Sequence, residues 1–184
     1  MDTDVHYESS KPPADAGGFA YNGFVTKPEV ELGNRLRVRG LKLATAESCT
    51  GGLLASRITD VPGSSDYFLG GVNAYAYEAK VALLQVSWDT LNAFGAVSRE
   101  TVLEMARGVR RALDADLSIS ISGIAGPGGG LPNKPVGTTW FGLVTPDGEW
   151  AYLHQFDGDR VRNKASATEA ALKILLDYLT GESK

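Results

Sequence analysis

Hydrophobic and polar positions follow two periods along most of the chain, and together they predict a succession of helices and strands. Apolar residues three or four apart, such as Val102, Met105 and Val109, indicate a helix that begins at an N-cap Ser98. Strict alternation over residues 117–121 indicates a strand. The other predicted elements are helices at 26–39 (with a Thr26-x-x-Glu29 capping box and an end at Gly40), 53–59 and 78–85, strands at 41–46 and 67–75, a hairpin over 136–155, and a last helix with Val161, Ala165, Thr168, Leu172, Leu175 and Leu179 on one face.

This order of elements predicts the fold class. Helices alternate with strands and one hairpin comes late, so we expect an α/β protein, a three-layer α/β/α sandwich around a mixed β-sheet. A length of 184 residues suits a single domain, which we assign to residues 26–184. Residues 1–25 are rich in Pro, Gly, Ser and Asp and show neither period, which predicts a loose N-terminal arm.

Composition removes several classes of function. The formal net charge of −4 argues against broad electrostatic binding to nucleic acid or to an anionic membrane. Cys49 is the single cysteine and only two histidines are present, so we expect neither a disulfide nor a structural metal, and a reducing, cytoplasmic location. No stretch is long and apolar enough for a membrane span, and the N-terminus lacks a secretory pattern.

The strand-to-helix turn around Ser48 is the most informative local feature. If the helix begins near Thr50, Ser48 lies at its positive end, and Gly51 and Gly52 let a substrate approach the backbone amides. Such a turn can bind an anion or stabilise an oxyanion beside a serine nucleophile. On this turn alone the plainer interpretation, an N-cap serine with two turn glycines, is favoured.

A serine nucleophile needs a base, and two residues outside the arm qualify. His154 lies in a predicted strand without an evident acidic partner. Lys80 lies early in a helix among apolar and aromatic residues, where loss of hydration lowers the pKa of an ammonium. Residues 126–130 form a glycine-rich loop that either cradles a phosphate or is a flexible surface loop, and its spacing fits neither a P-loop nor a dinucleotide site.

Seven short motifs occur in one order: TAESCTGGL (45–53), DVPGSS (60–65), GGV (70–72), EAKV (78–81), FGAVS (94–98), GIAGPGG (123–129) and KPVGT (134–138). Their ordered set closely resembles the CinA C-terminal domain family over about residues 28–180. The resemblance implies hydrolysis of the carboxamide of nicotinamide mononucleotide to nicotinic acid mononucleotide and ammonia, without a metal or organic cofactor. Many relatives carry this domain after a molybdopterin-cofactor-like domain, and this chain looks like the free-standing form, expected as a homodimer or higher homo-oligomer.

The resemblance also implies roles for individual residues. Ser48 is the expected nucleophile and Lys80 its base, with Tyr75 helping to position them. Arg162 falls at the place of the family's active-site arginine. The residues expected to bind substrate are Thr50, Gly51, Gly52, Ser122, Gly126, Gly128 and Arg162.

Two departures from the family pattern leave other functions open. Ser122 stands where the family usually has threonine, and Ala76-Tyr77 replace a Ser-Asn pair. If the missing asparagine contacts substrate, binding is weakened or altered. The alternatives are therefore an amidase of a different substrate and a non-catalytic module that binds a nucleotide or another protein.

Overall fold

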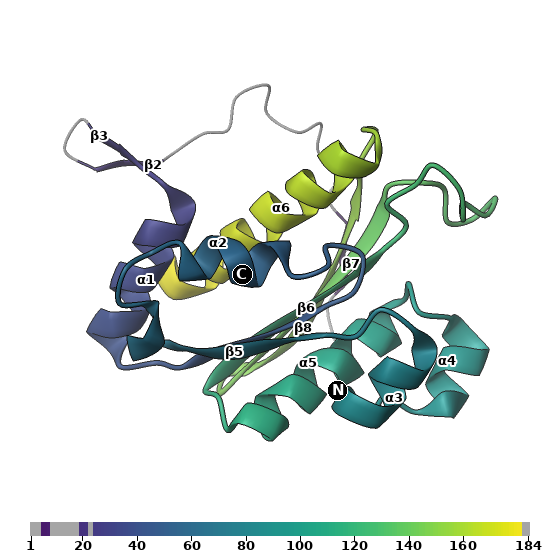
Figure 1. The fold of residues 1–184 in the computed structure, drawn as a ribbon, viewed down its shortest axis with the longest axis horizontal. Coiled ribbons are helices and arrows are strands. Elements are labelled where there is room, and N and C mark those ends of the chain that lie inside the picture. Colours follow the sequence, from purple (N-terminus) through teal and green to yellow (C-terminus); the bar gives the residue numbers. More distant parts are fainter. Residues whose placement is uncertain (1–4, 8–18, 22–23, 182–184) are drawn as a thin grey trace.

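The computed structural model describes residues 5–7, 19–21 and 24–181, and it has the three layers that the sequence predicts. Helices α1, α2 and α6 cover one face of the main sheet, and α3, α4 and α5 cover the other (Figure 1). Their bounds are Pro28–Arg39 (α1), Leu53–Thr59 (α2), Tyr77–Leu84 (α3), Trp88–Phe94 (α4), Arg99–Leu113 (α5) and Arg160–Thr180 (α6).

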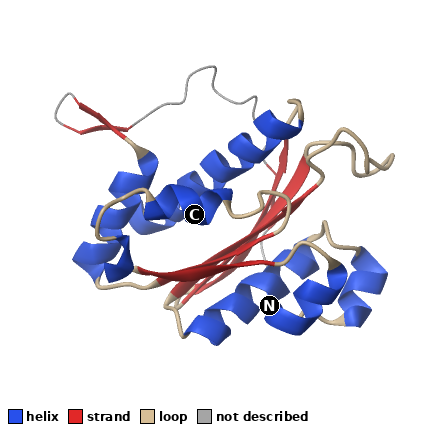
Figure 2. Ribbon diagram, viewed as in Figure 1, coloured by secondary structure: helices blue, strands red, loops and turns tan. Residues whose placement is uncertain are grey.

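The main sheet has six strands in the order β1-β8-β7-β6-β4-β5, and it is mixed, as predicted (Figure 2). β4 pairs in parallel with β5 and β6, whereas β6–β7 and β7–β8 pair antiparallel. β4 therefore lies inside the sheet with a partner on each side. The strand bounds are Val5–Tyr7 (β1), Leu43–Glu47 (β4), Phe68–Asn73 (β5), Leu117–Gly123 (β6), Thr138–Thr145 (β7) and Gly148–Gln155 (β8).

The N-terminal region differs from its prediction. The expected loose arm includes β1, which pairs in parallel with β8, and a separate ribbon of β2 (Phe19–Tyr21) and β3 (Phe24–Thr26). The remaining arm residues lie outside the described part of the chain. The predicted capping box at Thr26 is wrong, because Lys27 is the N-cap of α1 and no side chain caps the helix. The carboxylate of Glu29 instead accepts a hydrogen bond from Arg57 at 2.5 Å. The predicted helix end is confirmed at Gly40, whose φ is +64°.

Strand β6, which the alternation predicted, is buried on both faces. Its serines are covered by α5 and the loop before it, so their hydroxyls need partners inside the protein. Each hydroxyl donates to a backbone carbonyl over 2.6–2.7 Å. The pairs are Ser118 with Ala106, Ser120 with Val102 and Ser122 with Ala96.

Two further helices show where the sequence pattern misleads. The expected apolar face of α6 is wrong in its first turns, since Val161 is 76% exposed and Ala165 is exposed, whereas Asn163 and Ala167 are buried. The later part of that face, Thr168, Leu172, Leu175 and Leu179, is buried as predicted. Helix α4 has no counterpart in the prediction, although the Ser87 hydroxyl caps it by accepting from the Asp89 amide at 3.1 Å. A short 3-10 helix, η1 (Ser64–Asp66), also precedes β5.

Candidate active site

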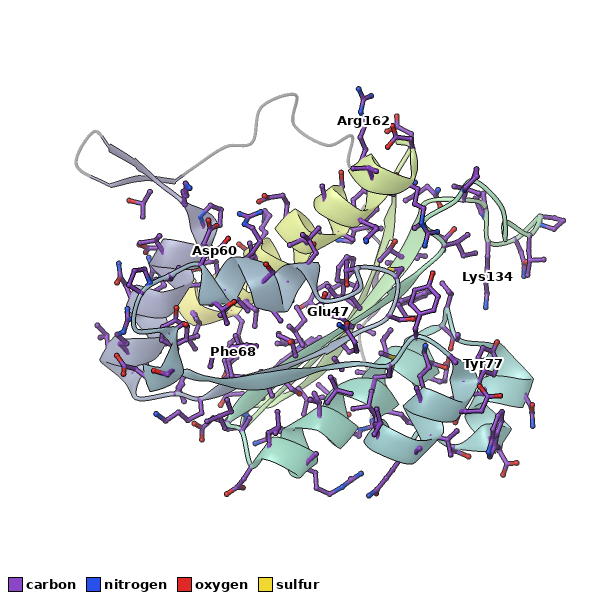
Figure 3. All side chains as sticks on the ribbon, in the orientation of Figure 1. Glu47, Asp60, Phe68, Tyr77, Lys134 and Arg162 are labelled. Atoms are coloured by element: carbon purple, nitrogen blue, oxygen red, sulfur yellow. The ribbon has the colours of Figure 1, made fainter. Side chains whose placement is uncertain are left out.

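The site is built at the carboxyl end of β4, where the chain leaves the centre of the sheet. Glu47 ends the strand and Ser48 follows it, and the Ser48 amide still donates to the Ile121 carbonyl of β6 at 2.9 Å. Figure 3 shows Glu47 between α2 and the sheet, well inside the molecule. In open α/β sheets the carboxyl ends of parallel strands are the usual place for ligands. Ser48 is therefore held by the sheet itself, as the strand prediction implied.

Glu47 fixes the turn that follows the serine, a role that sequence reasoning missed. Its buried carboxylate accepts hydrogen bonds from the amides of Gly52, Leu54 and Ala55 at 3.0, 3.1 and 2.8 Å. These are donors of the first turn of α2, which a carboxylate satisfies well. The expectation that Ser48 lies at the positive end of α2 is wrong, because α2 begins at Leu53 and Glu47 holds that end. The only sequence signal for this role is an acidic residue directly after an apolar strand.

The predicted oxyanion donors need the same correction. The Gly51 amide donates to the Ser48 carbonyl at 3.2 Å and the Gly52 amide donates to Glu47, so neither amide is free for substrate. No oxygen of a described residue accepts a hydrogen bond from the amides of Cys49 and Thr50. Thr50 is buried, and its hydroxyl has no hydrogen-bond partner among the described residues. The amides of Cys49 and Thr50 next to Ser48 are directed at the Cys49 sulfur, which is a weak acceptor.

Lys80 reaches Ser48 from the opposite layer of helices. It is fully buried on α3, and its Nζ donates to the Ser48 Oγ at 2.9 Å, to the Ala74 carbonyl at 2.7 Å and to the Tyr75 carbonyl at 3.1 Å. Burial removes water from the ammonium and lowers its pKa from 10.5 to about 8. The two residues that the sequence singles out from separate motifs therefore touch.

Cys49 and His154 lie in settings that differ from that of Ser48 and Lys80. Burial raises the pKa of the Cys49 thiol to about 11, which keeps it protonated and weakly nucleophilic at neutral pH. The His154 ring on β8 packs against the rings of Phe141 and Phe156, with centroids 5.3 and 5.9 Å away. Lys80 is thus the base candidate within hydrogen-bond distance of the Ser48 hydroxyl.

A bridge of three residues closes one side of the site. The Tyr75 side chain is 62% exposed, and its hydroxyl accepts a hydrogen bond from the Arg160 Nη2 at 2.8 Å. The Arg160 Nη1 donates to the Gly126 carbonyl at 2.8 Å. This Tyr75–Arg160–Gly126 bridge links the end of β5 to the glycine-rich loop. Arg160 thus joins Tyr75 to Gly126, whereas Gly128 lies exposed farther along the loop.

The role expected of Arg162 stays a prediction, and the side chain lies apart from the residues described above. Its side chain is exposed and points away from Glu47 in Figure 3. Asp159 caps α6 by accepting from the Arg162 amide at 2.9 Å, which fixes the rotation of the helix. Two residues correspond to about 200° around a helix, so Arg160 and Arg162 face opposite sides. Arg160 takes the position beside Tyr75.

Ser122 and Tyr77, the two departures from the family pattern, meet on one peptide. The Ser122 hydroxyl donates to the Ala96 carbonyl at 2.7 Å, so it is not the free substrate donor that we expected. The Tyr77 hydroxyl accepts from the Ala96 amide at 3.1 Å, and its ring packs near Trp88. Figure 3 shows Tyr77 on the α3–α4 side, away from Glu47. Both residues therefore hold the Ala96 peptide in place.

The described residues contain no group of three or more His, Cys, Asp or Glu side chains placed to hold a metal ion. None of the helices described is both long and apolar enough to cross a membrane.

Comparison with known proteins agrees with the motifs. The sequence model of the CinA C-terminal domain matches residues 25–179. The chain belongs to the CinA C-terminal domain family. A CinA-like protein of Chlorobaculum tepidum is 52% identical over 169 residues, which cover 89% of this chain and 40% of the relative. This member of the CinA family thus spans about two fifths of the curated relatives that it matches.

Solved CinA structures share the fold. A competence-damaged protein (CinA) superfamily protein of Klebsiella pneumoniae superposes with a TM-score of 0.81 at 36% identity, covering 84% of this chain and 96% of that one. One from Escherichia coli has a TM-score of 0.81 at 34% identity, with 89% and 95% covered. The names of these CinA proteins state no reaction and no substrate.

Proposed function

We propose that this CinA-family protein is an amidohydrolase that converts nicotinamide mononucleotide to nicotinic acid mononucleotide and ammonia through Ser48 and Lys80. The observation that carries the proposal is the 2.9 Å contact between the Lys80 Nζ and the Ser48 Oγ in a buried setting. Family membership and the motif resemblance supply the substrate. The site needs no metal or organic cofactor in this scheme.

The partners of Lys80 explain how it exchanges a proton with Ser48. A carbonyl oxygen only accepts hydrogen bonds, so the carbonyls of Ala74 and Tyr75 each require an N–H from Lys80. Once the ammonium loses its third proton, the two remaining N–H groups stay on these carbonyls. The lone pair then points at the Ser48 hydroxyl, which is the arrangement of a general base. A pKa of about 8 makes a useful fraction of this neutral amine available near neutral pH.

The reaction then balances with these groups alone. Lys80 takes the Ser48 proton as Oγ bonds to the carboxamide carbon, and the amides of Cys49 and Thr50 stabilise the oxyanion. The C–N bond breaks as Lys80 returns the proton to the nitrogen, which leaves as ammonia. A water gives its proton to Lys80 and attacks the seryl ester. The acid product departs, and Ser48 regains a proton from Lys80.

The test is ammonia release from nicotinamide mononucleotide by the wild type, Ser48→Ala and Lys80→Met. We expect turnover by the wild type and a loss of at least about a thousandfold in each variant, since members of a catalytic unit each cost most of the rate. Circular dichroism and melting curves control for folding. Full activity of a folded Ser48→Ala protein would refute the proposal.

Tyr77 favours a second candidate function, an amidase that acts on a different substrate. Since this residue replaces an asparagine of the family pattern, the panel includes other pyridine carboxamides and simple amides. Ammonia release from one of these, but not from the mononucleotide, would assign an altered amidase. Ligand binding without turnover, unaffected by Lys80→Met, would assign a binding module. The cytoplasmic location and the homo-oligomer stay predictions.

A further inference from the structure

Strand β8 receives one of its two neighbours from the far N-terminal part of the chain. The family model matches residues 25–179, and within that range β8 is the last strand of the sheet, paired on one side with β7. Among the described strands, only β1 pairs with the other side of β8, which we call the outer edge. β1 covers residues 5–7 and precedes the matched range. The matched part of the chain thus builds this edge, and a segment outside it fills the edge.

The sequence of β8 carries little protection against pairing with other strands. Natural proteins commonly protect an edge strand with proline, lysine or an inward-pointing charge. β8 contains neither proline nor lysine, and its single carboxylate, Glu149, is held in an ion pair with Arg107 of α5. Trp150 and Tyr152 are aromatic residues, which favour strands. An uncovered outer edge would therefore offer its N–H and C=O groups to another strand.

Both faces of β8 are packed, so the outer edge is held in place before a strand pairs with it. Ala151 is 2% exposed and lies in a cluster with Val102 and Leu103 of α5. Trp150 and Tyr152 pack on the larger core cluster, which includes residues of α6. A strand that docks on such an edge gains main-chain hydrogen bonds without the entropic cost of ordering the edge.

β1 docks on the outer edge as a separate segment. Its residues 5–7 lie opposite residues 151–153 in parallel register. Parallel neighbours cannot be joined by a tight hairpin, and most of the chain separates these two strands. Main-chain pairing between distant segments is the mode in which a sheet edge recruits an extended peptide. β1 therefore fills the edge as a bound peptide does, and its covalent tether raises its local concentration.

We propose that the outer edge of β8 is a docking site for an extended strand, which residues 5–7 fill so that a second copy of the chain does not pair there. The β8 edges of two copies can pair antiparallel around a twofold axis, because the same edge then serves in both copies. The tethered segment competes with this pairing at every protein concentration, whereas a second copy competes only when the protein is concentrated. β1 and β8 contain none of the residues of the proposed reaction.

The experiment compares the full-length wild type with the double variant His6→Pro, Tyr7→Pro. Successive N–H groups of a strand point to opposite sides, so two adjacent prolines remove a donor that faces β8, whichever of the two residues carries it. The matched control is His6→Val, Tyr7→Val, which keeps both N–H groups and favours a strand. Hydrogen exchange followed by NMR reports on the amides of residues 151–153, and sedimentation reports on association.

In the proline variant, the amides of residues 151–153 that face away from β7 should exchange at least about tenfold faster than in the wild type. Those that face β7 should keep their wild-type rates, which controls for the fold. A species of about twice the wild-type mass should form as the concentration of the proline variant rises. The valine variant should behave as the wild type in both measurements.

Equal exchange rates in the proline and valine variants would overturn the docking site. If both variants match the wild type, residues 5–7 do not cover the edge, and if both exchange faster, main-chain pairing is not what holds them. Faster exchange in the proline variant without any added association would overturn the role against a second copy.

Discussion

Replacing Lys80 with methionine tests whether the buried ammonium is destabilising at neutral pH. A fall in pKa from 10.5 to about 8 is about 2.5 units, and each unit corresponds to 1.36 kcal/mol, so the charged form costs the folded protein about 3 kcal/mol. Between pH 8 and 10.5 the unfolded chain binds the proton and the folded chain does not. We compare the wild type with a variant that carries a non-titrating residue at position 80. The free energy of unfolding of the wild type, relative to that variant, therefore rises with pH across this window. Below pH 8 the full cost is present.

The assay is urea unfolding of the wild type and Lys80→Met from pH 7 to 10.5. Methionine leaves three oxygens without their donor, and about 1 kcal/mol for each adds an offset that does not depend on pH. The measured quantity is the free energy of unfolding of the wild type minus that of Lys80→Met. This difference should rise by about 3 kcal/mol between pH 8 and 10.5. Lys173→Met, at an exposed lysine of α6, is the control. A difference that stays flat with pH would refute the reasoning.

Three further predictions concern separate parts of the molecule. Activity should rise with pH through about 8 as Lys80 loses its proton, which a pH profile of kcat/KM checks. Glu47→Gln should lower the free energy of unfolding, measured by chemical denaturation, by about 2 kcal/mol, because amide donors of α2 lose a charged acceptor. A variant as stable as the wild type would contradict the capping role of Glu47. Gly108→Ala should cost more than about 2 kcal/mol and lower the melting temperature, since a Cβ there would lie 2.0 Å from the Leu84 carbonyl oxygen; an unchanged melting temperature would contradict this packing.

The sequence predicted the parts of the site that local chemistry determines. Ser48 follows a buried apolar strand before a glycine pair, and Lys80 lies among apolar neighbours early in a helix, so each was visible alone. Their contact does not follow from spacing, because it depends on how α3 crosses the sheet, and only the family resemblance implied it. The alternation of periods was enough for the three layers, and those were predicted correctly.

The errors have physical causes that one sequence does not reveal. The sequence does not reveal which of Arg160 and Arg162 faces Tyr75, because that depends on the face of α6 that packs on the protein. The burial of the β6 serines does not show in the sequence, because it depends on helix carbonyls that accept their hydroxyl groups. Glu47 was overlooked because its partners are backbone amides, which carry no sequence signal.

The interior place of β4 has a consequence for dynamics. All five of its residues are buried and it has a hydrogen-bonded neighbour on each side, so its amides should exchange with solvent only when the whole protein unfolds. A side chain that directly follows such a strand, as Ser48 does, cannot drift to meet different ligands. We expect the Tyr75–Arg160–Gly126 bridge, which includes the exposed Tyr75 side chain, to move instead when a different ligand binds. Variation in substrate range among related proteins should therefore accumulate at this bridge and in the glycine-rich loop, where it leaves the stability of the fold intact.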